Sequence, residues 1–173
     1  TCDKDGSRKA DNMKELKSFF LDLDCGPSKD YANQSDALEA LRKFCDKLKL
    51  PNPLKINSGR GVHVYWRLTE SVGAENWLPI ATRLKALCAK HNLLADVAVT
   101  ADVCRVLRVP TTHNHKTDPP TEVTFFGLDA PPLVDFDEFA ELLGDDPIEI
   151  PRRYVPSDDT YLGGKESVFA DIL

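Results

Sequence analysis

Two aspartates separated by one residue, Asp22 and Asp24, follow an apolar run that begins at Phe19. Alternation along a strand puts both carboxylates on one face and leaves Leu21 and Leu23 on the other. Paired carboxylate oxygens suit Mg²⁺ or Mn²⁺ better than zinc. The alternative is a pair of solvated aspartates at a strand edge, but charges beside apolar residues are costly unless they bind something. The pair therefore predicts a divalent-metal site.

The next segment combines a glycine-containing turn with a strand, and it reads Ser58-Gly59-Arg60-Gly61-Val62-His63-Val64-Tyr65-Trp66. Its glycines let backbone N–H groups approach an anion closely, and the serine and the arginine supply further donors. On the strand, His63 shares a face with Tyr65 and Arg67. The alternative is a simple hairpin turn whose histidine is satisfied in the core. The combination favours a pocket that binds a triphosphate.

A third polar stretch, residues 95–116, carries two aspartates and a basic run. Asp96 follows an apolar stretch, as expected for a ligand on a strand, whereas Asp102 is placed to pair with an arginine three residues later. Phosphate contacts are expected here, although the arginines also suit structural ion pairs. The basic and polar candidates are Arg105, Arg108, Asn114 and Lys116.

In this order, the three blocks resemble the archaeo-eukaryotic primase superfamily, specifically the primase-polymerase domains of phages and mobile elements. The resemblance spans residues 17–128 and rests on a hydrophobic-D-h-D block, an S-G-x-G-h-H block and a hydrophobic-D block followed by an R-h-L-R-h-P-x-T-x-N-x-K run. Relatives often have P-G-T where this chain has Pro110-Thr111-Thr112, so the tight turn is expected to differ here.

The resemblance implies roles for individual residues. Asp22, Asp24 and Asp96 would bind two Mg²⁺ or Mn²⁺ ions, with Asp102 as the alternative third ligand, and His63 would join them in catalysis. The residues expected to bind the nucleotide are Lys29, Ser58, Gly59, Arg60, Gly61, His63, Arg105, Arg108, Asn114 and Lys116.

The function implied is that of a template-dependent nucleotidyltransferase, a DNA primase or polymerase. It would add nucleotides to a 3′-hydroxyl during replication of a phage or mobile element, in the host cytoplasm. The expected partners are a dNTP or NTP, a single-stranded DNA template or primer–template, and a helicase domain or protein. No membrane partner is expected.

Two alternatives use the same residues differently. A phosphohydrolase of the haloacid-dehalogenase type also begins with h-h-h-D-x-D at a strand end, but it has no use for the S-G-x-G-x-H block and needs a Rossmann-like scaffold. The other alternative is a non-catalytic replication-initiator module that binds DNA through a decayed metal site. Metal-dependent nucleotide binding would distinguish the enzyme from this module.

Composition narrows the class further. The chain has 173 residues, of which 22 are basic and 28 acidic, so the net charge is -6. This balance excludes a uniformly basic nucleic-acid coat but allows a local basic groove. No apolar stretch is long enough to span a membrane. The five cysteines are widely spaced and odd in number, which favours free thiols in a reducing cytosol.

The periodicity of the chain predicts the elements that must position these residues. Strands are expected at 19–24, 55–57, 62–68 and 123–128, a strand-and-turn region at 95–107, and helices at 35–50, 74–91 and 134–143. Together with the resemblance, this predicts an α/β (α+β) fold with a central, mainly antiparallel, RRM-like sheet and flanking helices. Residues 1–143 would form the catalytic core, with its N-terminal part missing, and the acidic, proline-containing residues 144–173 an arm or linker.

Overall fold

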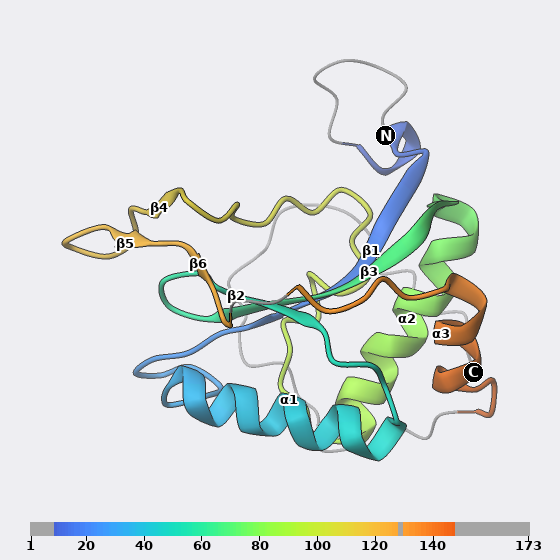
Figure 1. The fold of residues 1–173 in the computed structure, drawn as a ribbon, viewed down its shortest axis with the longest axis horizontal. Coiled ribbons are helices and arrows are strands. Elements are labelled where there is room, and N and C mark those ends of the chain that lie inside the picture. The colour runs from blue at the N-terminus through green and yellow to red at the C-terminus, as the bar shows by residue number, and fades with distance from the viewer. Residues whose placement is uncertain (1–8, 128–129, 148–173) are drawn as a thin grey trace.

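A computed structural model of the chain describes residues 9–127 and 130–147. Most of the polar candidate residues lie on or beside one antiparallel sheet, whose strand order is β1-β3-β2-β6. β4 and β5 form a separate two-stranded sheet. The expected mixed fold with a mainly antiparallel sheet is therefore confirmed (Figure 1). The elements in chain order are a 3₁₀ turn at Ala10–Asn12, β1 Glu15–Leu23, α1 Gln34–Leu48, β2 Leu54–Asn57, β3 Val62–Gly73, α2 Ala74–Lys90, β4 His113–Asn114, β5 Thr121–Glu122, β6 Thr124–Phe125 and α3 Phe136–Leu143.

The centre of the sheet is the antiparallel pair of β1 and β3. Residues directly opposite each other in such a pair point to the same face. Phe19 faces Trp66 and Leu21 faces Val64, and all of these side chains are buried. The alternate positions pair Asp22 with His63, so the aspartate and the histidine share the opposite face.

Helices cover the apolar face of this pair. In Figure 1, α1 lies along one side of the sheet, with α2 and α3 beside it. Phe19 is the centre of this packing, with its ring 5.5 Å from that of Trp77 in α2 and 4.8 Å from that of Phe139 in α3. Burial of these large aromatic rings is the main source of stability here.

The two longer helices occur where periodicity predicts them. α1 begins after Asn33, whose side chain accepts a hydrogen bond from the backbone N–H of Asp36, and it ends at Lys49 in a left-handed conformation. α2 contains Pro79 near its start, where the loss of a backbone N–H is tolerated.

The region after α2 differs from the prediction. Among the described residues, 95–107 form successive turns with no strand, so Asp96 is carried by a turn and not by a strand. The strand predicted at 123–128 is reduced to the two residues of β6, and residue 128 lies outside the described residues. In place of strand pairing, this segment is held by scattered backbone hydrogen bonds, such as the one from Asp96 N–H to the carbonyl of Asp22 (2.9 Å).

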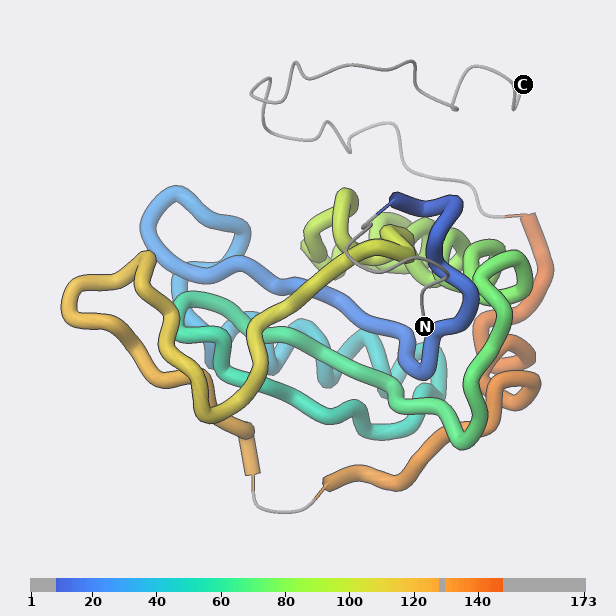
Figure 2. The backbone as a smooth tube through the Cα atoms, turned by 90° about the horizontal axis from the view of Figure 1, so that it is seen from above, coloured from blue at the N-terminus to red at the C-terminus, as the bar shows by residue number. Residues whose placement is uncertain are grey.

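This segment covers part of the sheet face that the helices leave open. Figures 1 and 2 show the chain between α2 and β4 crossing the sheet on the side opposite α1. No described helix is long and apolar enough to cross a membrane. Most of the arm predicted at 144–173 lies outside the described residues, which end at 147.

Candidate functional site

A pocket of about 570 Å³ opens on the sheet face that carries Asp22 and His63. Its walls come from β1, from the turn between β2 and β3, and from the segments 96–108 and 114–116. The sequence candidates that line it are Asp22, Asp24, Lys29, Ser58, Arg60, His63, Asp96, Arg105, Arg108, Asn114 and Lys116. Tertiary structure thus brings three distant segments of the chain together.

The two candidates for the third carboxylate are separated by this geometry. Asp96 lines the pocket beside Asp22 and Asp24, and Asp102 does not. Asp102 instead accepts a hydrogen bond from the backbone N–H of Cys104, an arrangement that stabilises the local turn. Asp96 is the carboxylate in place to act with the other two.

Asp22 is the most perturbed acid of the pocket. Its pKa is raised to about 6, mainly by burial and in part by the negative charges of Asp24 and Asp96. Arg105 and Arg108 act in the opposite direction but do not cancel the effect. A nearby cation would stabilise the charged form of this buried carboxylate more than that of an exposed one.

The two other carboxylates are paired with cations at the pocket rim. Lys29 Nζ lies 3.0 Å from Asp24 Oδ2, and Arg105 Nη2 lies 3.8 Å from Asp96 Oδ2. The contact with Asp24 raises the pKa of Lys29. Both pairs are partly exposed to solvent, where an ion pair contributes only about 0–1 kcal/mol. They can therefore open at little cost when a ligand enters.

His63 is almost entirely buried, with 1% of its side chain exposed, and its Nε2 lies 3.8 Å from Asp22 Oδ1. Its pKa is lowered to about 4, mainly by burial and in part by the positive charge of Arg108. The ring is therefore neutral at pH 7. Among the described residues, Nδ1 has no hydrogen-bond partner. A buried polar atom without a partner is costly, and functional sites are one of the places where such atoms occur.

In the turn between β2 and β3, the backbone N–H groups of the glycines are not placed as the sequence predicts. The backbone N–H of Gly59 donates to Asn57 Oδ1 (2.8 Å), and that of Gly61 donates to Ser58 Oγ (3.1 Å). These two N–H groups are used inside the turn and are not free to cradle an anion. Glycine is needed here for space, because a Cβ on Gly61 would lie 2.4 Å from the carbonyl oxygen of Leu23.

This close approach presses the turn against the end of β1 and so places Ser58 and Arg60 beside the aspartates. Gly59, whose φ is +92°, also packs against Asn114. Of the predicted nucleotide-binding residues, only the two glycines do not line the pocket. Their contribution is to its shape.

Asn114 also differs from its expected role. It is buried, its Nδ2 donates to the carbonyl of Ser58 (2.8 Å), and its Oδ1 accepts from the N–H of Lys116 (3.0 Å). Its amide therefore ties the 113–116 segment to the turn. The donor available to a ligand in this segment is the side chain of Lys116, which lines the pocket.

Two pocket residues, Val106 and Leu107, were not predicted from the sequence. Val106 is well exposed, although it is apolar. The sequence around Val106 does not show that this residue faces the pocket, because its position depends on the path of the turns.

The carboxylate oxygens of the pocket are the type of ligand that a divalent metal binds, but they do not meet at one point in this structure. Among the described residues, no group of three or more His, Cys, Asp or Glu side chains is close enough to hold an ion as they stand. Nevertheless, three carboxylates face one pocket, and repulsion from Asp24 and Asp96 adds to the effect of burial in raising the pKa of Asp22. Oxygen donors under such repulsion are the kind that Mg²⁺ or Mn²⁺ would bind.

Comparison with known proteins shows a likeness in fold without a likeness in sequence. No family model matches the chain, and no curated protein matches it. A solved structure that is similar is the AEP domain of the primase-polymerase of cyanophage S-2L, with a TM-score of 0.60. The match covers 82% of this chain and 68% of that one, at 18% sequence identity. This chain therefore shares the fold of that phage primase-polymerase domain.

Proposed function

We propose that this chain is a metal-dependent nucleotidyltransferase of the primase-polymerase type, which adds nucleotides to the 3′-hydroxyl of a nucleic acid strand. The observation that carries the proposal is the pocket itself, where two carboxylates at the end of β1 and a third from a distant turn meet a set of basic side chains. The fold shared with a phage primase-polymerase domain supports it.

The acidic residues would hold the metal. Asp22, Asp24 and Asp96 would bind two Mg²⁺ or Mn²⁺ ions, which lower the pKa of a 3′-hydroxyl and screen the charge of the phosphates. A positive charge at this point would offset the burial and the repulsion that together raise the pKa of Asp22. Lys29 and Arg105 would release Asp24 and Asp96 and become free for the nucleotide.

The basic residues would bind the triphosphate. Arg60, Arg105, Arg108 and Lys116 line the same pocket as the carboxylates, so a phosphate chain there would contact both sets. His63, neutral because of its lowered pKa, would donate a hydrogen bond to a phosphate oxygen without repelling a metal held by Asp22. These donors would stabilise the charge that develops on the phosphates during transfer.

The substrates proposed are a dNTP or NTP and a single-stranded or primed DNA template, with a helicase domain or protein as partner and the host cytoplasm as location. A phosphohydrolase of the haloacid-dehalogenase type has no support from the fold, because such enzymes need a parallel Rossmann-like sheet. Here β1, β2, β3 and β6 pair antiparallel throughout.

The test is nucleotide incorporation on a primed template with Mn²⁺ or Mg²⁺. The double variant Asp22→Asn, Asp24→Asn should lose incorporation and metal-dependent nucleotide binding while keeping its circular dichroism spectrum. Lys43→Gln, on the exposed surface of α1, is the matched control and should keep both. An active double variant would refute the proposal, and an unchanged chain that binds DNA but no nucleotide would favour the non-catalytic module.

A further inference from the structure

A second hollow lies on the same sheet face, next to the candidate site. We call it the sheet groove and define it by Lys17, Tyr65, Arg67, Arg108, Phe125 and Leu133, which are among the residues that line it. Its volume is about 570 Å³. Leu107 and Arg108 line both the groove and the candidate site, so the two hollows are adjacent. A molecule in the sheet groove would lie next to the proposed active site.

The charge of the groove is one-sided. Lys17, Arg67 and Arg108 are basic, and no acidic residue is among the described residues that line it. This stands out in a chain whose net charge is -6. A local excess of positive charge in an acidic protein indicates an anionic partner.

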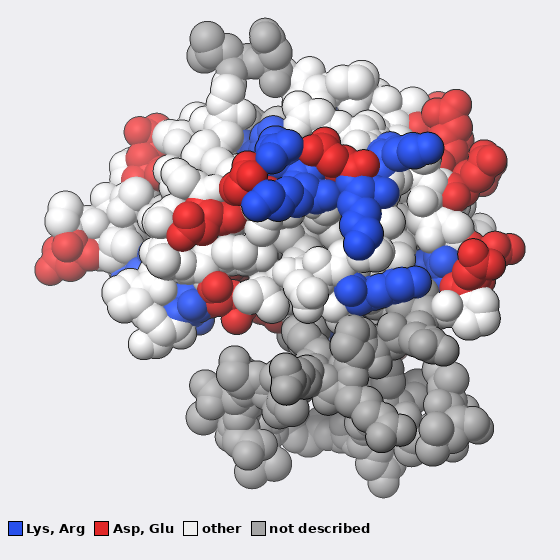
Figure 3. Space-filling view, turned by 90° about the horizontal axis from the view of Figure 1, so that it is seen from below, with Lys and Arg blue, Asp and Glu red and all other residues white. Residues whose placement is uncertain are grey.

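The face that carries α1 shows the opposite arrangement. Figure 3 shows Lys and Arg interspersed with Asp and Glu on the molecule's lower side. Arg42 bonds to both Glu39 and Asp46, and Lys43 pairs with Glu39. These basic side chains neutralise their neighbours, so the α1 face offers little net charge to an anion.

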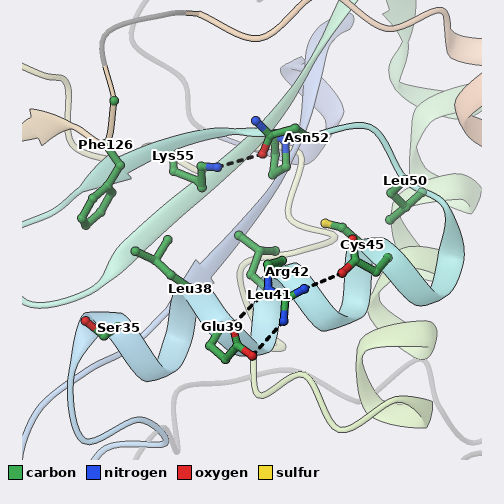
Figure 4. A pocket seen from close by; sticks show the side chains of 13 residues that line it. Ser35, Leu38, Glu39, Leu41, Arg42, Cys45, Leu50, Asn52, Lys55 and Phe126 are labelled. Carbon is green, nitrogen blue, oxygen red and sulfur yellow. Dashed lines mark hydrogen bonds and ion pairs between the residues drawn. The ribbon is translucent and has the colours of Figure 1, made fainter.

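The pocket beside α1 is no better placed to bind an anion. Figure 4 shows its apolar floor, formed by residues such as Leu38 and Leu41, and the ion pairs of Arg42 at its rim. Its other basic residue, Lys55, donates to Asn52 Oδ1 (2.8 Å). This pocket also has two acidic residues, Glu39 and Asp46, in its lining, whereas the described residues that line the sheet groove include no acidic side chain.

Two aromatic side chains lie in the groove. Tyr65 and Phe125 stand opposite Leu54 and Ile56 of β2, on different strands. Strand spacing and rise place such positions roughly 12 Å apart on an ideal sheet, too far to hold one base between them. They would contact different nucleotides of a strand. Phe125 is 54% exposed, and it shares the groove with two other exposed apolar side chains, Val109 and Leu133. A group of exposed apolar side chains is typical of a binding surface.

We propose that the sheet groove binds single-stranded nucleic acid, with bases stacked on Tyr65 and Phe125 and the backbone near Lys17 and Arg108. The proposal rests on the proposed function, since the strand would be the one that the neighbouring site copies or extends. Aromatic faces combined with a basic track are the means by which proteins bind single strands without sequence preference. A duplex would not offer its bases for stacking in this way.

The experiment measures the affinity of the full chain for a fluorescent oligothymidylate by anisotropy, without nucleotide or metal. Phe125→Ala should weaken binding about tenfold, the effect expected from the loss of one stacked base. Lys17→Gln should weaken binding less than Phe125→Ala does. It should also reduce the slope of the logarithm of affinity against the logarithm of salt concentration by about one, the value for one phosphate contact. Leu142→Ala in α3, another exposed apolar position, and Lys43→Gln are matched controls that should bind as the unchanged chain does.

The outcomes separate this proposal from the previous one. If Phe125→Ala binds the oligonucleotide normally in a chain that incorporates nucleotides, the groove proposal fails and the enzyme proposal stands. If the unchanged chain neither binds nor incorporates nucleotides, yet Phe125→Ala weakens strand binding, the enzyme proposal fails and the groove stands. Sedimentation is the further check. A dimer that Phe125→Ala dissociates, with oligonucleotide affinity unchanged, would assign the groove to a second copy and overturn the inference.

Discussion

The two faces of the β1–β3 pair are built from alternate residues of the same strands, yet they follow opposite physical rules. On the helix-covered face, Phe19, Leu21 and Val64 are fully buried and apolar. On the open face, Asp22 and His63 are also largely buried, but their pKa values move toward the uncharged forms. One face stabilises the fold by burial, and the other holds charges in a costly place. Costly polar placement of this kind is typical of functional sites.

The buried face also holds the polar residues of the open face in position. The open face lies on strands that the helix face already anchors, so Asp22 and His63 cannot move apart without disturbing the core. The turn 58–61 and the turn that carries Asp96 then close over the strand end. Four predictions test this difference.

The largest effect is expected on the helix-covered face. Phe19→Ala should reduce the free energy of unfolding by about 3–5 kcal/mol, because a fully buried ring that stacks on Trp77 and Phe139 is replaced by a cavity. Urea denaturation measures this value. Phe125→Ala, which removes an exposed ring of the same type from the open face, is the control and should cost far less. Equal losses in the two variants would contradict the division between the faces.

An increase in stability is expected on the open face. Asp22→Asn should raise the free energy of unfolding by about 2–3 kcal/mol at pH 8 without metal, since a pKa shift of one unit corresponds to about 1.4 kcal/mol. The folded-state pKa of about 6 lies above the ordinary value of 3.8, so the native chain loses stability as the pH rises through this interval. Asparagine does not titrate and avoids the loss.

The pH dependence of the same variant tests His63. Its folded-state pKa of about 4 lies below the ordinary 6.5, so its stabilising effect is complete above pH 6.5 and is lost as the pH falls toward 4. In the unchanged chain this slope opposes that of Asp22. Urea titrations of Asp22→Asn in a chelator should therefore show stability rising between about pH 4 and 6.5. A flat profile in the variant would show that His63 is not desolvated as described.

The smallest effect on stability is expected at Arg60, which is exposed at the pocket rim. Arg60→Ala should change the free energy of unfolding by less than about 0.5 kcal/mol. The metal-dependent affinity of this variant for a dNTP should nevertheless fall about tenfold, the effect expected from the loss of one charge-assisted hydrogen bond. Calorimetric titration measures this affinity, with Arg42→Gln on α1 as the matched control. Unchanged affinity would remove Arg60 from the proposed triphosphate site.

Local pattern was sufficient for the strands and helices that bury an apolar face. The alternation at 19–24 and 62–67 and the 3–4 residue spacing in α1 and α2 each reflect a repeating environment, which neighbouring residues report together. Pattern selected Asp96 for the pocket but placed it on a strand that the structure lacks, and it did not show the contacts of Asn114, because the surroundings of both residues come from distant segments. Asp96 is held by the carbonyl of Asp22, and Asn114 by that of Ser58.

The same limit applies to the glycine turn and to the sheet groove. The sequence shows that the turn needs glycine, but not that the N–H groups of Gly59 and Gly61 are already bonded to Asn57 and Ser58. Likewise, nothing near Phe125 in the sequence indicates that it shares a surface with Lys17 and Arg67.

The amino-acid sequence by itself determined which side chains are apolar, which are charged, and on which face of a strand each falls. Only the tertiary structure decided that Asp22 pairs with His63 across two strands, and that a turn carrying Asp96 closes over them. The reason is that side-chain alternation is a property of consecutive residues. Strand register and the path of a loop depend on contacts between segments far apart in the chain, and these exist only once the core has formed.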